Sequence, residues 1–320
     1  MKLQILIPHY KEPIFILENL LNSIDSQLGV DFEDDIGVII CNDGIDVPIP
    51  IDLLQKYKFK IEYIINPHEG VSYTRNTLLN ASNADFIMCC DCDDIFISNL
   101  GLDLVFDCLE KYDPDVFISA FYEESKTHSY ILKETDSFLV HGKIFKRKYL
   151  LDSDIHWNNQ LFFSGDTYFL NQALNLTDNI VYSRIPFYLY KWNDDSICRR
   201  EKNHFTRSYA MKLLGDKLLI KRFIEIDRSD LAQASVVDMV QDMYFMSHSL
   251  NWQKDSVKDC TKRAEEEFVK MFSEFKDLYN SSTAKQRITN YNNKLLSYAS
   301  SGPIEGYLGI DPWLNSLGVC

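Results

Sequence analysis

The sequence of 320 residues contains no apolar run as long as the roughly 20 residues that a membrane-spanning helix needs. Its first apolar run, residues 3–7, is too short for a signal peptide and is followed by Pro8 and then by charged residues. We therefore expect a cytoplasmic protein, in which thiols stay reduced. Peripheral association with the inner face of the membrane is the other localisation that we keep open.

The sequence also lacks an excess of positive charge. It has 47 acidic and 33 basic residues, which gives a formal net charge of −14. Binding to nucleic acid depends on lysines and arginines that neutralise phosphates. We therefore expect no general affinity for nucleic acid.

The eight cysteines do not form the pattern of a zinc site. Structural zinc needs four cysteine or histidine ligands at suitable spacing, and no second Cys/His pair complements Cys90 and Cys92. Because side chains alternate along a strand, Cys90 and Cys92 should share one face and Cys89 the other. We interpret these cysteines as small core residues.

The pattern that is present in the first half is an alternation of strands and helices. Short apolar runs predict strands over residues 3–7, 36–41, 60–65, 84–90 and 115–121, and apolar spacing predicts helices over residues 14–28, 71–81 and 100–112. Such alternation indicates an α/β fold with βαβ units and a mostly parallel sheet.

The second part of the sequence has a different pattern. After about residue 200, four helical patterns follow one another without a strand signal, over residues 202–226, 230–250, 256–278 and 283–298. We predict one domain over residues 1–199 and a helical C-terminal region over residues 200–320. That region could bind an acceptor, dock at a membrane or form a homo-oligomer.

Polar residues follow three of the predicted strands at the point where each strand ends. They are the segments PHY after residue 7, NDG after residue 41 and DCDD after residue 90. Ligands bind at the carboxyl ends of the strands in such sheets, so we expect all three segments at one edge. Three carboxylates within four residues repel one another, and Mg²⁺ or Mn²⁺ would relieve that repulsion. Taken alone, this pattern also fits a solvent-exposed acidic turn.

Four motifs occur in a fixed order along the first 95 residues: ILIPHYKEP, ICNDG, NPHEGVSYTRN and CCDCDD. Together they resemble the nucleotide-sugar-binding half of family 2 glycosyltransferases. The resemblance implies the GT-A fold, a Rossmann-like, mostly parallel central sheet with flanking helices. It also divides residues 1–199 into a nucleotide-sugar-binding half (1–95) and an acceptor half (96–199). The departures from the family pattern are mild, with Lys11, Ile45 and Thr74 replacing the usual asparagine, serine and alanine.

The resemblance also implies roles for individual residues. Asp43 should accept a hydrogen bond from the imide N–H of uracil, and Asp91 should meet the ribose and the sugar. Asp93, together with Asp91, should hold Mn²⁺ or Mg²⁺ against the diphosphate. The residues implied to bind the nucleotide sugar are Pro8, Tyr10, Glu12, Asp43, Arg75, Asp91, Cys92 and Asp93. A further metal or phosphate contact could come from Lys191, Asn193 or Asp194.

The acceptor half contains the candidate catalytic base. The segment FFSGDTYF (162–169) resembles the Glu-Asp-X-X-Phe segment of the family, in which the aspartate starts a helix and serves as general base. Gly165 replaces the glutamate, so the match depends on Asp166. An aspartate at a helix start is also a good N-cap. The segments 141–147 and 188–197 resemble the Gly-Lys segment and the closing strand of the family.

The resemblance therefore implies a metal-dependent, inverting glycosyltransferase. It would move a sugar from a nucleotide sugar, UDP being the favoured nucleotide, to an acceptor hydroxyl. The expected acceptor is a surface glycan or a lipid-linked intermediate. We keep three alternatives open: a nucleotidyltransferase, a decayed nucleotide-sugar-binding module, and a modified nucleic-acid base as acceptor. A nucleotidyltransferase would ordinarily have a Gly-rich basic loop after the first strand, and residues 8–10 provide none.

Overall fold

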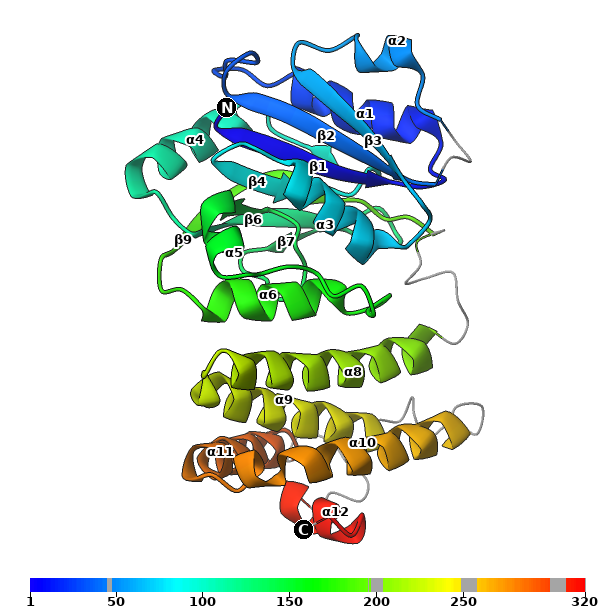
Figure 1. The fold of residues 1–320 in the computed structure, drawn as a ribbon, viewed down its shortest axis with the longest axis vertical. Helices are drawn as coiled ribbons and strands as arrows, with labels where there is room; N and C mark the ends of the chain where they lie inside the picture. Colours follow the sequence, from blue (N-terminus) through cyan, green and yellow to red (C-terminus); the bar gives the residue numbers. More distant parts are fainter. Residues whose placement is uncertain (45–47, 195, 197–203, 249–257, 300–308, 320) are drawn as a thin grey trace. The chain divides into compact units, whose positions relative to one another are not determined.

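The computed structural model describes residues 1–44, 48–194, 196, 204–248, 258–299 and 309–319. The chain divides into two units, Met1–Arg200 and Glu201–Cys320 (Figure 1). None of the helices among the described residues is long and apolar enough to cross a bilayer.

The first unit is built on a mixed sheet. In the described residues its strand order is β3-β2-β1-β4-β8-β6-β9-β5, with β7 paired to β6. The first four strands along the chain pair with one another in parallel: β1 (Leu3–His9), β2 (Ile36–Asp43), β3 (Lys60–Asn66) and β4 (Phe86–Cys89). Their carboxyl ends therefore lie at one edge of the sheet, as the sequence predicts.

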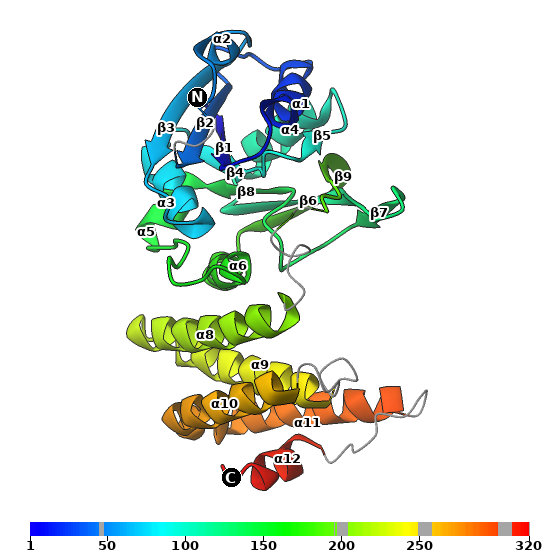
Figure 2. The same cartoon turned by 90° about the vertical axis from the view of Figure 1, so that its right-hand side faces the viewer.

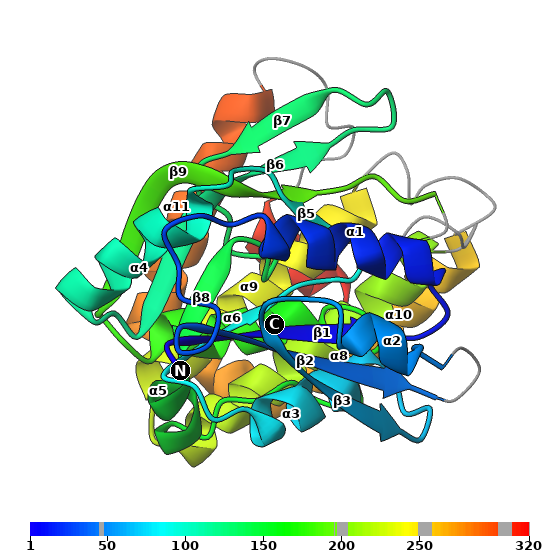
Figure 3. The same cartoon turned by 90° about the horizontal axis from the view of Figure 1, so that it is seen from above.

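The second half of the sheet is mixed in direction. Its strands are β5 (Ile95–Phe96), β6 (Val116–Glu124), β7 (Tyr130–Lys133), β8 (Lys143–Lys146) and β9 (Ile180–Tyr190). β8 runs antiparallel to β4 and β6, whereas β9 runs parallel to β6. Figure 3 shows β7 extending the sheet beyond β6.

Helices cover both faces of the sheet (Figure 2). The core cluster on one face includes apolar residues of α1 (Ile14–Asp25) and α4 (Gly101–Tyr112). The cluster on the other face includes residues of α3 (Val71–Ala81), α5 (Arg147–Asp152) and α6 (Gly165–Asn175). A short helix, α2 (Ile51–Leu54), precedes β3. Alternation along the strands supplies both clusters, since Ile5 and Ile7 enter the first and Leu6 enters the second.

The same alternation accounts for the cysteines around the acidic segment. Cys90 and Cys92 pack in the cluster with α1 and α4, and Cys89 packs in the other cluster. All three are buried free thiols, which confirms their predicted place in the core.

The second unit consists of helices in its described residues: α8 (His204–Glu225), α9 (Ser229–His248), α10 (Lys258–Tyr279), α11 (Ser282–Ala299) and α12 (Ile310–Ser316). α9 contacts each of the other four helices. Buried aromatic side chains fill the unit, and Phe268 and Trp313 stack with ring centroids 5.5 Å apart. The helical C-terminal region is confirmed.

Several strand boundaries differ from prediction, since β1, β2, β3 and β6 continue beyond their predicted ends to His9, Asp43, Asn66 and Glu124. β4 ends at Cys89, one residue before the predicted end, because Cys90 leaves the register with β1 and only its N–H still bonds to Leu6. The closing strand predicted over residues 188–197 is the end of β9, which stops at Tyr190. Residues 191–194 lie beyond the strand, and 195 and 197 are outside the described residues.

Candidate active site

The edge formed by the ends of β1, β2 and β4 brings the sequence motifs together. Pro8 lies opposite Cys41, and Asp43 lies opposite Asn66, in the parallel ladders. Beyond β1, the backbone N–H of Tyr10 donates to the Glu12 carboxylate at 2.8 Å. The same carboxylate is beside the buried thiol of Cys92, whose pKa is raised by burial and by that negative charge. Glu12 thus joins the β1 motif to the acidic segment.

Asp43 holds the start of helix α3. Its carboxylate accepts the backbone N–H of Glu69 at 2.9 Å and that of Gly70 at 3.0 Å. The His68 ring nitrogen Nδ1 lies 3.0 Å from Asp43 Oδ2. Gly70 has a φ of 94°, a left-handed conformation that glycine adopts without strain. The carboxylate at this helix N-terminus also complements the helix dipole.

Arg75 joins two predicted site residues from distant parts of the chain. It projects from α3 and is 5% exposed. Nη1 donates to Asp166 Oδ1 at 2.6 Å, and Nη2 donates to Asp91 Oδ1 at 2.9 Å. Burial alone would lower the pKa of Arg75, but the two carboxylates outweigh it and raise that pKa. The candidate base and a candidate donor-binding carboxylate therefore share one buried cation.

Asp166 lies in the first turn of α6 but does not cap it. The N-cap residue is Ser164, and the Asp166 side chain instead bonds to Arg75. The indole N–H of Trp157 lies 3.4 Å from the same oxygen, Oδ1. Trp157 is fully buried and stacks on Phe169, with ring centroids 3.8 Å apart. In the described residues no hydrogen bond reaches Asp166 Oδ2, so this oxygen could accept a proton from a ligand.

The three carboxylates of the acidic segment have different surroundings. Burial would raise the pKa of Asp91, but the Arg75 guanidinium holds it below its usual value. Burial and the charge of Asp91 raise the pKa of Asp93, which accepts a hydrogen bond from the Asn193 amide at 2.7 Å. Asp94 is fully buried, and burial and its two neighbours raise its pKa well above the ordinary value.

Asp94 has protein partners on both oxygens. Oδ2 accepts from the Tyr188 hydroxyl at 2.5 Å, and Oδ1 accepts from the backbone N–H of Lys191 at 2.8 Å. Of the three candidates for a further contact, Asn193 meets Asp93, whereas Lys191 meets Asp94 through its main chain. Asp194 accepts a hydrogen bond from the Trp192 indole at 2.9 Å.

His141 completes an acidic group that could hold a metal ion. Ligand atoms of Asp91, Asp94 and His141 all lie within 4.8 Å of one another. His141 is 3% exposed, stacks on Tyr190 with ring centroids 4.4 Å apart, and has a pKa lowered by burial. Its Nδ1 has no hydrogen-bond partner in the described part of the chain and lies 3.5 Å from Asp94 Oδ2. Carboxylate oxygens suit Mg²⁺ or Mn²⁺, and an imidazole also suits transition metals such as Zn²⁺, so the donor set fits a divalent cation without identifying it.

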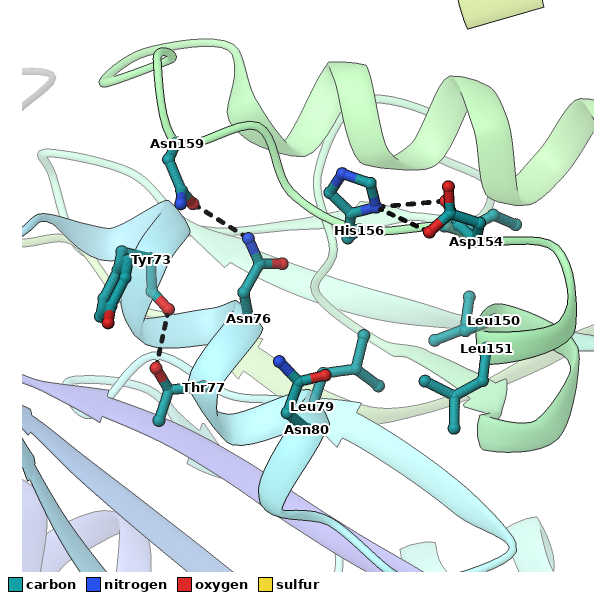
Figure 4. A pocket seen from close by; sticks show the side chains of 11 residues that line it. Tyr73, Asn76, Thr77, Leu79, Asn80, Leu150, Leu151, Asp154, His156 and Asn159 are labelled. Carbon is teal, nitrogen blue, oxygen red and sulfur yellow. Dashed lines mark hydrogen bonds and ion pairs between the residues drawn. The ribbon is translucent and has the colours of Figure 1, made fainter. Parts of the chain in front are cut away.

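A cavity of about 410 Å³ lies between α3, α5 and the loop 154–159 (Figure 4). None of the predicted site residues lines it. Asn76 does, and it holds the backbone of Trp157 by donating to its oxygen at 2.8 Å and accepting from its N–H at 2.9 Å. The cavity wall thus supports the indole that contacts Asp166, while the charged groups lie at the sheet edge.

Comparison with known proteins settles the family. Residues 4–174, more than half of the chain, match the sequence pattern described as glycosyl transferase family 2. The chain belongs to glycosyl transferase family 2. The predicted family and the assignment as a glycosyltransferase enzyme are therefore confirmed. No curated protein matches this family 2 sequence.

Solved structures agree on the fold of this family 2 chain. Residues 1–349 of S. aureus TarS superpose with a TM-score of 0.55 at 16% identity, covering 84% of this chain and 91% of that one. The same TarS segment solved with UDP and with UDP-GlcNAc gives TM-scores of 0.54. A longer TarS structure is matched over 55% of its length. The likeness confirms the GT-A-like fold with a helical region after it.

Several residues at this family 2 site were not assigned roles from the sequence, among them Trp157 and His68. Trp157 is a single tryptophan in the polar stretch HWNNQ, and no spacing in that stretch points to Asp166. His68 lies within the third motif, yet its contact with Asp43 depends on the path of the loop before α3. The only signal for His68 was its place between the end of β3 and Gly70.

Proposed function

We propose that this family 2 enzyme transfers a sugar from a UDP-sugar to an acceptor hydroxyl with inversion at the anomeric carbon. One observation carries the proposal: Arg75 bonds both Asp91, a candidate donor-binding carboxylate, and Asp166, the candidate base. TarS, which has a similar fold, has been solved with UDP and with UDP-GlcNAc, and this supports the choice of UDP. Inversion is taken from the resemblance to the family.

Each residue of the site would have a separate role. The nucleotide would be lined by Pro8, Tyr10, Asp43 and Cys92, and Glu12 would hold the turn after β1. The acceptor hydroxyl would approach Asp166 Oδ2, which has no protein hydrogen bond in the described residues. As the hydroxyl oxygen bonds to the anomeric carbon, its proton passes to Asp166. The bond from that carbon to the diphosphate oxygen breaks, and the electron pair leaves with UDP.

Asp91 and Asp93 would hold the metal ion, Mn²⁺ or Mg²⁺. Both are only partly buried, whereas Asp94 is fully buried and already accepts two hydrogen bonds. Burial and the charge of Asp91 raise the pKa of Asp93, so a bound cation would stabilise its ionised form. When bound, the ion would neutralise charge on the leaving diphosphate. Asp94 and His141 would support the ion from the buried side.

The remaining assignments follow from the family. Residues 1–95 would bind the nucleotide sugar, and residues 96–199 would bind the acceptor, a glycan or a lipid-linked intermediate of surface polysaccharide synthesis. The helical region would serve the acceptor, a membrane surface or self-association.

A thermal-shift screen of nucleotide sugars, with and without Mn²⁺, tests the choice of donor. A ligand that binds the folded state must raise its apparent stability. We expect UDP-sugars to raise the midpoint temperature of unfolding in the presence of Mn²⁺. In a separate assay, an enzyme should slowly hydrolyse the UDP-sugar and release UDP, whereas a binding module should not. A response to ADP- or GDP-sugars alone, or to no nucleotide sugar, would contradict the proposal.

A further inference from the structure

One face of the Tyr10 ring is covered by a neighbouring side chain. The imidazole of His68 stacks on it with ring centroids 4.2 Å apart and an interplanar angle of 2°. An aromatic residue would hold a flat nucleobase through the same kind of parallel stacking contact. A base that stacks on this face of Tyr10 must first replace the His68 ring.

Three donors, the N–H groups of Glu69 and Gly70 and the ring of His68, already reach the carboxylate of Asp43. A carboxylate offers about four lone-pair positions. Oδ1 accepts from Glu69 N–H at 2.9 Å and more weakly from Gly70 N–H at 3.3 Å. Oδ2 accepts from Gly70 N–H at 3.0 Å and lies 3.0 Å from His68 Nδ1. The side chain is 8% exposed, so a further donor can reach it only where a present one withdraws.

Among these donors, His68 is the one that can withdraw. The N–H groups of Glu69 and Gly70 belong to the main chain at the start of α3, which the left-handed conformation of Gly70 holds in place. The His68 side chain is 58% exposed and is attached to that main chain only by its own rotatable bonds. Rotation of one half-exposed side chain would release both the Tyr10 face and an acceptor position on Asp43.

We propose that His68 occupies the nucleobase position in the free enzyme and that the uracil of the donor binds by displacing it. The inference rests on the proposed function, in which a uracil meets Tyr10 and Asp43. Imidazole and uracil share a flat ring and an N–H that a carboxylate can accept. The nitrogen at the equivalent ring position of cytosine carries no hydrogen, so cytosine cannot replace the His68 donor. The position therefore selects a pyrimidine with an imide N–H.

Occupation of the nucleobase position by His68 lowers the apparent affinity for the donor, because only protein molecules in which His68 has moved away can bind the nucleotide. Removing the ring should therefore tighten nucleotide binding. His68→Ala should bind UDP about fivefold more tightly than the native chain, which corresponds to about 1 kcal/mol. Had His68 been a second wall that holds the base, the same change would weaken binding instead.

Titration calorimetry with UDP and Mn²⁺ tests the inference on the native chain, His68→Ala and the control His156→Ala. His156 is a matched control, because its side chain is 48% exposed and its Nδ1 also lies near an aspartate, 3.7 Å from Asp154. We expect tighter binding for His68→Ala alone. A long-range ¹H–¹⁵N spectrum of the native chain should also show the His68 ring nitrogens shifting when UDP is added.

The outcomes separate the inference from the proposed function. If the native chain binds UDP and His68→Ala binds it equally or less tightly, the displacement of His68 is refuted while UDP binding stands. If neither protein binds UDP, the proposed donor is refuted and the inference with it. Binding by His68→Ala but not by the native chain would support both.

Discussion

Replacing Arg75 with glutamine tests whether one buried cation holds the two halves of the site together. Glutamine keeps a polar side chain but is shorter than arginine and carries no charge. Asp91 and Asp166 would then lose the partner that both now share. We expect Arg75→Gln to lower the free energy of unfolding of the first unit and to abolish UDP-sugar turnover.

The size of the loss follows from the burial of the three groups. Removing one partner of a buried ion pair costs about 3–5 kcal/mol, because the other charge is left uncompensated. The side chain of Arg75 is 7% exposed, but those of Asp166 and Asp91 are 20% and 33% exposed. Water reaching the two carboxylates reduces the cost. We therefore expect a loss of about 3 kcal/mol, at the lower end of that range.

Urea unfolding of Arg75→Gln, Asp166→Asn and the double variant measures this loss and assigns it. In a double-mutant cycle, residues in contact show coupling of about 0.5–3 kcal/mol. Arg147→Gln is the control, because the Arg147 Nε donates to the neutral Ser82 hydroxyl at 3.0 Å. A loss for Arg75→Gln no larger than for Arg147→Gln, with no coupling to Asp166, would refute the shared-cation geometry.

Two further predictions concern the metal and the helical unit. Chelation of the metal ion with EDTA should weaken UDP binding to the native chain at least about tenfold. Asp93→Ala should bind UDP in Mn²⁺ no more tightly than the native chain does in EDTA. If calorimetry shows that Asp93→Ala binds UDP in Mn²⁺ as tightly as the native chain does in Mn²⁺, Asp93 is not a metal ligand. In the helical unit, burial raises the pKa of Asp216 to about 7, although Lys212 opposes this rise. The folded state therefore binds the Asp216 proton more tightly than the unfolded state does. The contribution of Asp216 to the free energy of unfolding is largest below about pH 4 and falls by up to about 4 kcal/mol as the pH rises through about 7. Asp216→Asn should flatten this dependence in urea unfolding between pH 5 and pH 8, and parallel curves for the two proteins would contradict it.

Much of the donor half of the site follows from the sequence because of how a parallel sheet is built. The ends of β1, β2 and β4 must meet at one edge, so the motifs around Tyr10, Asp43 and Asp91 come together however far apart they lie in the chain. Strand alternation likewise predicts which core cluster receives Cys89 and which receives Cys90. Both arguments depend on backbone geometry alone.

The contacts that depend on side-chain placement were not predictable in the same way. Arg75 meets Asp166 across 91 residues of sequence, and no periodicity links the two. The place of His141 beside Asp94 depends on how β8 enters the sheet between β4 and β6. β5, β7 and β8 have two to four residues each, too few for an apolar pattern to reveal them.

The most direct test of the proposed mechanism is the turnover of Asp166→Asn with its donor and acceptor. The amide keeps an oxygen for Arg75 and for the Trp157 indole but cannot take up the acceptor proton. We expect kcat to fall by about 10²–10⁴, the usual contribution of a general base. Calorimetry should show nearly unchanged UDP affinity. Native turnover in Asp166→Asn would show that this carboxylate is not the base.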